Sequence, residues 1–144
     1  MKLDTEHCVF CKILEGIIPG SKVYEDDKVF AFLDIAPFNF GHTLVIPKVH
    51  CHAISDMDDE YRAAMFNAAA KIAPAILRAT GADGFNLLLN NGQVAGQEVP
   101  HVHLHIIPRF VDDQVLLSAA KKQYQGTEMA DLQAKIQEKI ANRS

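Results

Sequence analysis

The stretch His101-Val-His-Leu-His-Ile-Ile-Pro-Arg109 alternates imidazole and aliphatic side chains over its first six residues. On an extended strand, residues two apart face the same side of the sheet at a spacing of about 6.6–7 Å. The three histidines therefore form one row, while Val102, Leu104 and Ile106 point to the opposite face. Three aliphatic side chains fix the register, since a slip by one residue would bury three imidazoles instead. The pattern predicts a half-buried strand with a polar site on its histidine face.

The rest of the chain predicts a small sheet around this strand. A short helical turn over 8–16 ends at a glycine, and the histidine strand itself covers residues 101–108. Further β-prone runs lie at 22–25, 29–34, 43–47 and 85–90. The fold class is therefore α+β, with a mainly antiparallel five-stranded sheet, one long helix and a C-terminal helix.

The two longer helices follow from apolar periodicity. Over residues 55–80 apolar side chains recur every three or four positions and Gly81 stands where a C-terminal cap belongs, so we expect one long helix. Pro74 lies inside it and predicts a local kink or a break, because proline removes one backbone hydrogen bond. Near the C-terminus, an apolar stripe from Met129 to Ile140 predicts a terminal helix.

Length and charge exclude several classes of protein. The chain has 144 residues, about one domain, with a net charge of −4. An acidic chain of this size lacks the basic surface expected of a protein that binds long nucleic acid. A local pocket could still bind a single nucleotide. No apolar run is long enough to span a bilayer and no signal peptide is recognisable, so we expect a cytoplasmic protein that contacts no membrane.

The histidine row has three interpretations. Such residues can be solvated surface histidines, although three in register make this less attractive. Two histidines spaced HxH can share one metal ion with a carboxylate or a third histidine, as in catalytic zinc sites. The middle imidazole can also act as a nucleophile toward phosphorus while its neighbours stabilise the phosphate oxygens. The polar stretch over 90–99, with two glycines, favours phosphate because its amides can turn toward an anion.

A second motif is Cys8-Val-Phe-Cys11, which provides half of a tetrahedral zinc site. The redox interpretation is poor because no thioredoxin-like βαβ unit follows. Two buried small residues remain the simplest alternative.

The chain resembles the histidine triad family of nucleotide hydrolases and transferases. The resemblance is carried by His101–Arg109, and in order along the chain by Phe32-Leu-Asp-Ile35, Gly41–Lys48, His50 and Gly96-Gln97. It implies a histidine triad domain over 1–110, a C-terminal extension of the same domain over 111–144, and a homodimer. It also implies hydrolysis at the α-phosphate of a purine nucleotide conjugate, through a nucleotidyl-histidine and without a catalytic cofactor.

The resemblance assigns roles residue by residue. It makes His103 the nucleophile, His105 a stabiliser of phosphate charge and His42 a residue that orients the row. The remaining substrate contacts are expected for the purine, the ribose and the phosphate. They are Val9, Phe10, Phe32, Asp34, Ile35, Asn90, Gly96, Gln97, Glu98 and Val99.

Three further features compare the chain with particular branches of the family, and position 98 is a departure from the common pattern. Glu98 stands where many members carry a serine or threonine, and an ionised glutamate cannot donate a hydrogen bond to the leaving group. The Pro108-Arg109 ending resembles bacterial members and diadenosine polyphosphate hydrolases more than phosphoramidases. Similar bacterial-type members carry a structural zinc, and its ligands here would be Cys8, Cys11, His50 and His101.

Two rival functions remain open at this point. One is a metal-dependent hydrolase that uses the HxH row as ligands. The other is a nucleotide-binding scaffold protein whose catalysis is vestigial.

Overall fold

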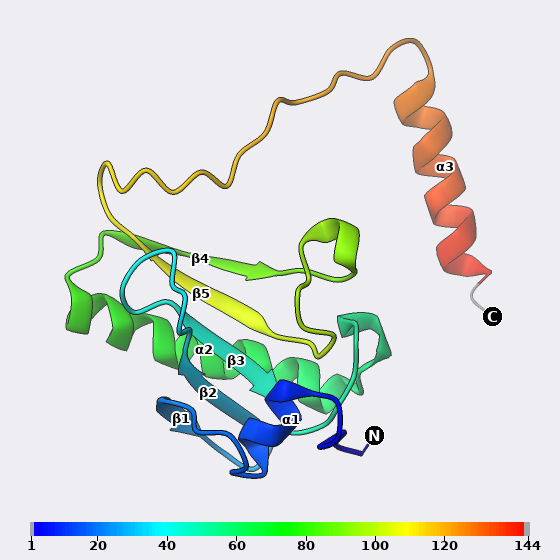
Figure 1. The fold of residues 1–144 in the computed structure, drawn as a ribbon. Helices are drawn as coiled ribbons and strands as arrows, with labels where there is room; N and C mark the ends of the chain where they lie inside the picture. The colour runs from blue at the N-terminus through cyan, green and yellow to red at the C-terminus, as the bar shows by residue number, and fades with distance from the viewer. Residues whose placement is uncertain (1, 143–144) are drawn as a thin grey trace.

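The computed structural model describes residues 2–142. Residue 1 of the predicted domain over 1–110 and residues 143–144 of the predicted extension over 111–144 lie outside the described residues. Within the described residues, five strands form one antiparallel sheet in the order β1-β2-β3-β5-β4 (Figure 1). Their bounds are Lys22–Glu25 for β1, Val29–Leu33 for β2, Thr43–Pro47 for β3, Gly84–Leu89 for β4 and Leu104–Arg109 for β5. The predicted α+β class with a five-stranded sheet is confirmed.

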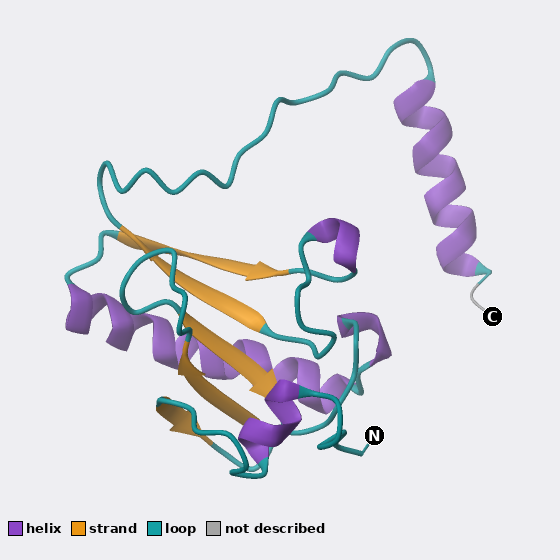
Figure 2. Cartoon of the chain, in the orientation of Figure 1, coloured by secondary structure: helices purple, strands orange, loops and turns teal. Residues whose placement is uncertain are grey.

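Helices cover both faces of this sheet, as Figure 2 shows. The long helix α2, Asp59–Thr80, packs on one face, and the short helix α1, Val9–Leu14, packs on the other. Two 3₁₀ turns, η1 at Ile54–Asp56 and η2 at Gln93–Ala95, lie in the connections. A third helix, α3 at Glu128–Ala141, follows an extended segment and stands apart from the sheet.

The central strand β3 shows how the two cores arise. All five of its residues are buried. Val45 packs in the core between the sheet and α2, whereas Leu44 and Ile46 pack with Phe10 of α1 in the second core. Because successive side chains alternate between the faces, one fully buried strand supplies both cores. Among the described residues, no helix combines the length and apolarity needed to cross a membrane.

Of the kink or break expected at Pro74, the break does not occur. Helix α2 runs without interruption from Asp59 to Thr80 and ends at Gly81, whose φ of 77° and N–H bond to the Leu77 carbonyl form the predicted cap. Buried side chains on both sides of the proline, Ile72 and Ile76, anchor the helix to the sheet. This packing outweighs the one hydrogen bond that proline removes.

The histidine strand starts later than predicted. Strand β5 begins at Leu104 rather than at His101, although Val102 still points into the α2 core as expected. The backbone before Leu104 bonds elsewhere, because the Val102 N–H donates to the Cys51 carbonyl. The ring of His101 donates to the carbonyl of Pro47 at the end of β3.

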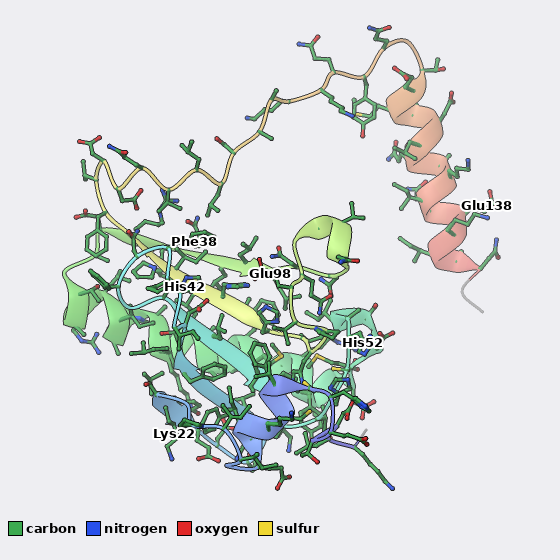
Figure 3. All side chains as sticks on the ribbon, viewed as in Figure 1. Lys22, Phe38, His42, His52, Glu98 and Glu138 are labelled. Atoms are coloured by element: carbon green, nitrogen blue, oxygen red, sulfur yellow. The ribbon has the colours of Figure 1, made fainter. Side chains whose placement is uncertain are left out.

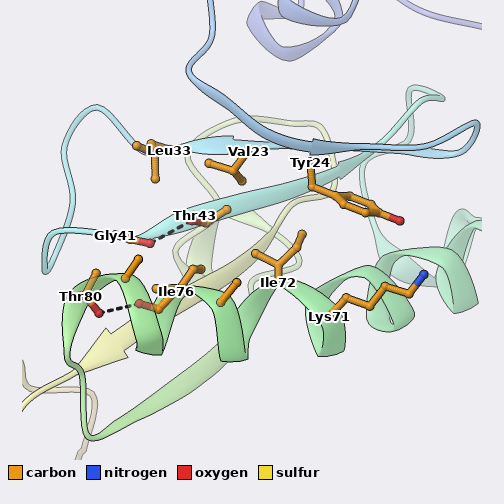
Figure 4. A pocket seen from close by; sticks show the side chains of 11 residues that line it. Val23, Tyr24, Leu33, Gly41, Thr43, Lys71, Ile72, Ile76 and Thr80 are labelled. Atoms are coloured by element: carbon orange, nitrogen blue, oxygen red, sulfur yellow. Dashed lines mark hydrogen bonds between the residues drawn. The ribbon is translucent and has the colours of Figure 1, made fainter.

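A cavity of about 490 Å³ lies between α2 and the β1 side of the sheet (Figure 4). Val23 of β1 and Ile72 of α2 are among its residues, and its lining contains no histidine, cysteine or carboxylate. At one end Gly41, with φ of 100°, lies so close to α2 that a Cβ there would come within 2.8 Å of the Thr80 methyl carbon. A glycine is therefore required where the β2–β3 loop crosses the helix.

Candidate functional site

A second cavity, of about 630 Å³, lies on the α1 face of the sheet. The volume is in the range of sites that hold small-molecule ligands. One wall is mostly apolar, and the other carries two histidines and two carboxylates. The lining residues are Val9, Phe10, Ile13, Ile18, Pro19, Gly20, Ser21, Phe32, Leu33, Asp34, Ile35, Ala36, Leu44, Glu98, Val99, His103 and His105.

This cavity brings together most of the predicted substrate residues. Phe10 and Phe32 are buried at its base, with ring centroids 5.6 Å apart, while Ile35 is fully exposed at its edge. Asp34 uses one carboxylate oxygen to accept the Ala36 N–H at 2.9 Å, and its other oxygen lies 3.7 Å from His42 Nε2.

Three of the predicted substrate contacts, Asn90, Gly96 and Gln97, do not line this cavity. The Gln97 side chain spans the loop instead, accepting the Gly92 N–H at 2.8 Å and donating to the His52 carbonyl at 2.7 Å. The Asn90 side chain donates to the Gly96 carbonyl at 3.3 Å. Both amide side chains therefore shape the loop before β5.

The protonation of the His103 ring follows from a backbone contact. Its Nδ1 lies 2.7 Å from the carbonyl oxygen of His101. A carbonyl only accepts hydrogen bonds, so Nδ1 carries the proton and donates. In a neutral ring the lone pair is then on Nε2, and His103 lines the cavity. The ring is 5% exposed and packs edge-on against Phe10.

A chain of hydrogen bonds sets the protons of His42 and His105 in the same way. The Phe38 N–H donates to His42 Nδ1 at 3.1 Å, so His42 carries its proton on Nε2. That Nε2 lies 2.9 Å from His105 Nδ1 and donates to it. His105 then holds its own proton on Nε2 and can donate a hydrogen bond, while His103 can accept one or attack. Figure 3 shows Phe38 and His42 together on the loop between β2 and β3.

Burial keeps these rings neutral. Desolvation lowers the pKa of His42 and His103, and it lowers the pKa of His105 to about 4, with the neighbouring His103 acting in the same direction. Asp34 opposes this effect at all three rings, but it does not outweigh burial. The tautomers derived above therefore apply near neutral pH.

A separate cluster joins the cysteine pair to two histidines. Cys8 and Cys11 of the α1 turn, His50 after β3 and His101 before β5 each offer one ligand atom, and these four atoms lie within 4.8 Å of one another. Cys8 Sγ is 3.3 Å from His101 Nδ1, and Cys11 Sγ is 3.4 Å from His50 Nδ1. Sulfur and nitrogen ligands on one tetrahedral zinc lie about 3.6 Å apart, so the spacing fits zinc.

The chemistry of the donors agrees with this spacing. His101 Nε2 donates to the Pro47 carbonyl at 3.2 Å, which leaves the Nδ1 lone pair directed at the two sulfurs. Burial raises the pKa of the Cys11 thiol to about 11, so metal binding would release its proton. The third cysteine, Cys51, is next to His50 in the sequence but is buried in the α2 core.

A second group that could hold a metal ion is formed by Asp34, His42 and His105. Its two nitrogens lie 2.9 Å apart, a hydrogen-bond distance. Two histidine nitrogens on one tetrahedral zinc lie about 3.3 Å apart, so this pair suits a shared proton better than a shared metal.

Among the contributors to the site that were missed from the sequence are two backbone groups that orient histidines. The amide of Phe38 orients His42, and the carbonyl of Pro47 orients His101. Both act through backbone atoms, which every residue type carries, so no side-chain pattern could reveal them.

The HIT domain family matches residues 15–112 of the chain. The protein named hit from Bacillus subtilis is 52% identical over 105 residues, which cover 73% of this chain and 72% of that protein. An adenosine 5'-monophosphoramidase from Schizosaccharomyces pombe is 46% identical over 71% of this chain and 74% of the relative. The adenylylsulfatase HINT3 of Arabidopsis thaliana is 44% identical over 81% of this chain and 59% of the relative.

Solved structures extend the similarity to nearly the whole chain. The crystal structure of SMU.412c from Streptococcus mutans matches with a TM-score of 0.91 and 44% identity, covering 97% of this chain and 89% of that one. A Zn-bound histidine triad family protein from Mycobacterium smegmatis matches with a TM-score of 0.75 and 36% identity, covering 92% and 99%. Together with the Cys/His cluster, these similarities fit the predicted bacterial type, and the chain belongs to the HIT, or histidine triad, family.

Proposed function

We propose that this protein hydrolyses purine nucleotide conjugates at the α-phosphate, with His103 Nε2 as the nucleophile. The observation that carries the proposal is the bond between His103 Nδ1 and the His101 carbonyl. It leaves a neutral nitrogen lone pair in a cavity of suitable size. Neutral imidazole is a competent nucleophile near pH 7 without further activation.

The reaction has two balanced steps. In the first, His103 Nε2 forms a bond to the α-phosphorus, and the bond from phosphorus to the leaving group breaks with its electron pair, the leaving group taking a proton from water. In the second, water attacks phosphorus, the P–N bond breaks, its electrons return to Nε2 and one proton enters solvent. The positive charge of the intermediate ring is stabilised by its Nδ1–H bond to the His101 carbonyl.

The neighbouring rings serve the phosphate. The His105 Nε2–H donates to the oxygen on which negative charge builds, because its Nδ1 is occupied by His42. His42 acts as a positioning residue, since it lies beneath His105 and does not line the cavity. A single hydrogen-bond donor of this kind contributes about 2.7–4 kcal/mol in other enzymes.

The remaining lining fits a nucleoside. Phe10, Phe32, Val9 and Ile35 offer an apolar slot for the base, and the Asp34 carboxylate can accept hydrogen bonds from ribose hydroxyls. Four residues before β5 are the proposed contacts to the phosphate and the leaving group, in part through their backbone atoms. They are Asn90, Gly96, Gln97 and Val99, with Glu98 beside them at the cavity wall.

Zinc, when bound by Cys8, Cys11, His50 and His101, would supply a closed four-ligand structural cross-link. It would tie α1, which forms one wall of the cavity, to the segment that carries His103. The chemical step needs no metal in this proposal.

Two relatives indicate the conjugates to test first. One is named as an adenosine 5'-monophosphoramidase and one as an adenylylsulfatase. We therefore propose adenosine conjugates as substrates, with dinucleoside polyphosphates as a further class suggested by the Pro108-Arg109 ending.

A homodimer is part of the same proposal. Strand β4 lies at the edge of the sheet, and its Phe85 and Leu87 are 42% and 43% exposed. A second copy pairing along this edge would cover both side chains and satisfy the free backbone groups. The three free thiols favour a reducing compartment such as the cytoplasm.

The test is a comparison of the wild-type chain with His103→Ala. We expect wild-type hydrolysis of at least one adenosine phosphoramidate, sulfate or dinucleoside polyphosphate, and this activity should persist in excess chelator. His103→Ala should lose turnover by at least about 10³-fold while it still binds adenosine monophosphate. Retained hydrolysis in the variant would overturn the proposal, and loss of wild-type activity in chelator with the fold intact would favour a metal-dependent reaction.

A further inference from the structure

The loop that carries His42 is fastened to a part of the chain far away in sequence. The Asn39 side chain donates to the Pro108 carbonyl at 2.9 Å and to the Asp113 carboxylate at 3.0 Å. The same residue accepts the His42 N–H on its own carbonyl at 3.0 Å. Asn39 therefore joins the end of β5 to the turn that holds His42.

Asp113 is the centre of this attachment. Its carboxylate accepts hydrogen bonds from Arg109 Nε at 2.7 Å and Arg109 Nη2 at 2.9 Å. It also accepts the N–H groups of Phe110 and Val115, each at 3.0 Å. With the bond from Asn39, one carboxylate receives five donors, and its side chain is 6% exposed. So many bonds fix the carboxylate in place.

The backbone around Asp113 is held in an uncommon conformation. Asp112 and Gln114, on either side, have φ values of 59° and 62°, in the left-handed region that non-glycine residues rarely adopt. Such residues persist where surrounding bonds over-determine them. The turn therefore directs Asp113 back toward Arg109 and Asn39, although the following segment leads away from the sheet.

The link from Asn39 to the reacting rings is short. The amide of its neighbour Phe38 donates to His42 Nδ1, which places the His42 proton on Nε2 and so determines the His105 tautomer. The Phe38 ring also stacks on His42 with centroids 5.4 Å apart. A shift of Asn39 would move the amide that orients both rings.

We propose that Asp113 is a positioning residue for the reaction, which holds the Phe38–His42 loop through Asn39 and thereby keeps His105 as a hydrogen-bond donor to the phosphate. This inference rests on the proposed function for its catalytic consequence, but the tautomer assignment stands independently of it. Asp113 itself contacts neither the cavity nor the rings.

The test compares Asp113→Asn and Asn39→Ala with the wild-type chain. Asp113→Asn keeps the shape of the side chain but removes the charge and one acceptor, and Asn39→Ala removes the donor from the other side of the link. The control is Asp83→Asn, because Asp83 accepts the Val111 N–H at the same end of the sheet and has no bond to Asn39. Unfolding midpoints confirm that each variant is folded.

Two readouts are needed. Nitrogen-15 NMR of the imidazoles reports which ring nitrogen carries the proton, and steady-state kinetics separates kcat from KM. We expect both variants to lose the single tautomer of His42 and His105. Their kcat should fall by about tenfold or more, with KM changed less than twofold, since small misplacements of catalytic groups carry costs of this order. Asp83→Asn should keep wild-type tautomers and a kcat within twofold.

Unchanged tautomers in both variants would overturn the inference, whatever happens to kcat. Unchanged kcat with altered tautomers would overturn its catalytic part. If the wild-type chain hydrolyses none of the conjugates, the proposed function fails, and the NMR comparison alone then decides whether Asp113 positions the rings.

Discussion

At the scale of single residues, the site depends on where protons lie on four buried or half-buried histidines. Backbone groups decide this for three of them: the carbonyls of Pro47 and His101 and the amide of Phe38. The tautomer of the fourth, His105, is set by the hydrogen bond that its Nδ1 accepts from His42 Nε2. As a result, the neighbouring rings of His103 and His105 have opposite roles: His103 has a free lone pair on Nε2, and His105 has a free N–H on Nε2.

The position of Glu98 leads to a prediction about the leaving group. Its carboxylate lies at the cavity wall near His103 and should repel an anionic leaving group more than a neutral amine. We expect Glu98→Gln to raise kcat/KM for dinucleoside polyphosphates by about three- to tenfold relative to a phosphoramidate, which corresponds to about 1 kcal/mol.

Matched kinetics on both substrates check this expectation. Glu138→Gln is the control, since it removes the same charge from the distant helix α3 (Figure 3). Equal changes for the two substrate classes would show that Glu98 does not select the leaving group.

Much of the site could be predicted at this scale. The four Cys/His side chains come together as the resemblance implied, whereas the spacing of the cysteine pair alone indicated only half of a metal site. The contacts of Asn90 and Gln97 could not be derived in the same way. Their amides are equally suited to a phosphate and to a loop carbonyl, and the fold of the loop decides which partner each one meets.

At the scale of elements, binary patterning predicted the strands and helices, because each face of the sheet has its own core. The predicted start of β5 was wrong, and of the kink or break predicted at Pro74 the break does not occur. Both depend on tertiary contacts: the Val102 N–H bonds to Cys51, and buried residues around Pro74 hold the helix on the sheet. The local conformational preference of the sequence gives no information about either contact.

Gly41 gives a prediction for the loop between β2 and β3. A Cβ there meets the Thr80 methyl at 2.8 Å, and Thr80 is fixed by its bond to the Ile76 carbonyl (Figure 4). With φ of 100° as well, Gly41→Ala should lower the free energy of unfolding by about 2–4 kcal/mol.

Urea unfolding measures this change. Gly84→Ala is a suitable control, since its Cβ would have no neighbour within 4 Å, and we expect it to change stability by less than about 0.5 kcal/mol. Similar midpoints for the two variants would contradict the close packing of this loop on α2.

The zinc cluster gives the second prediction at this scale. Removal of a ligand with Cys11→Ser should abolish zinc binding and lower Tm by roughly 10 °C, because structural zinc contributes several kcal/mol to folding. Zinc content by elemental analysis and thermal unfolding are the measurements. Cys51→Ala should keep the full zinc content, since Cys51 packs in the other core. Unchanged zinc in Cys11→Ser would reject these ligands.

At the scale of the whole molecule, the C-terminal segment differs most from the rest. Helix α3 forms where the apolar stripe predicted it, yet all of its residues are exposed, including Ile136 at 51% and Ile140 at 65%. A periodic sequence predicts the helix but not the surface it meets. That residues 111–144 belong to the same domain remains a proposal.

The dimer proposal predicts the effect of a charge on the free edge of the sheet. Leu87→Lys should convert a wild-type dimer into a monomer, because it places a cation in the apolar contact and blocks strand pairing. Light scattering after size exclusion gives the masses. Ile17→Lys, at another exposed apolar residue, should remain dimeric. A monomeric wild-type chain at micromolar concentration would contradict the proposed assembly.

The most direct test of the proposed chemistry is a rapid quench of the wild-type chain in denaturant at alkaline pH, which preserves a P–N bond, during turnover of an adenosine conjugate, followed by intact mass and peptide mapping. The tautomer of His103 predicts one adenylyl group on that histidine, formed within the first turnover and absent from His103→Ala. Turnover without any covalent species, or an adenylyl group on a different residue, would contradict the proposed role of His103.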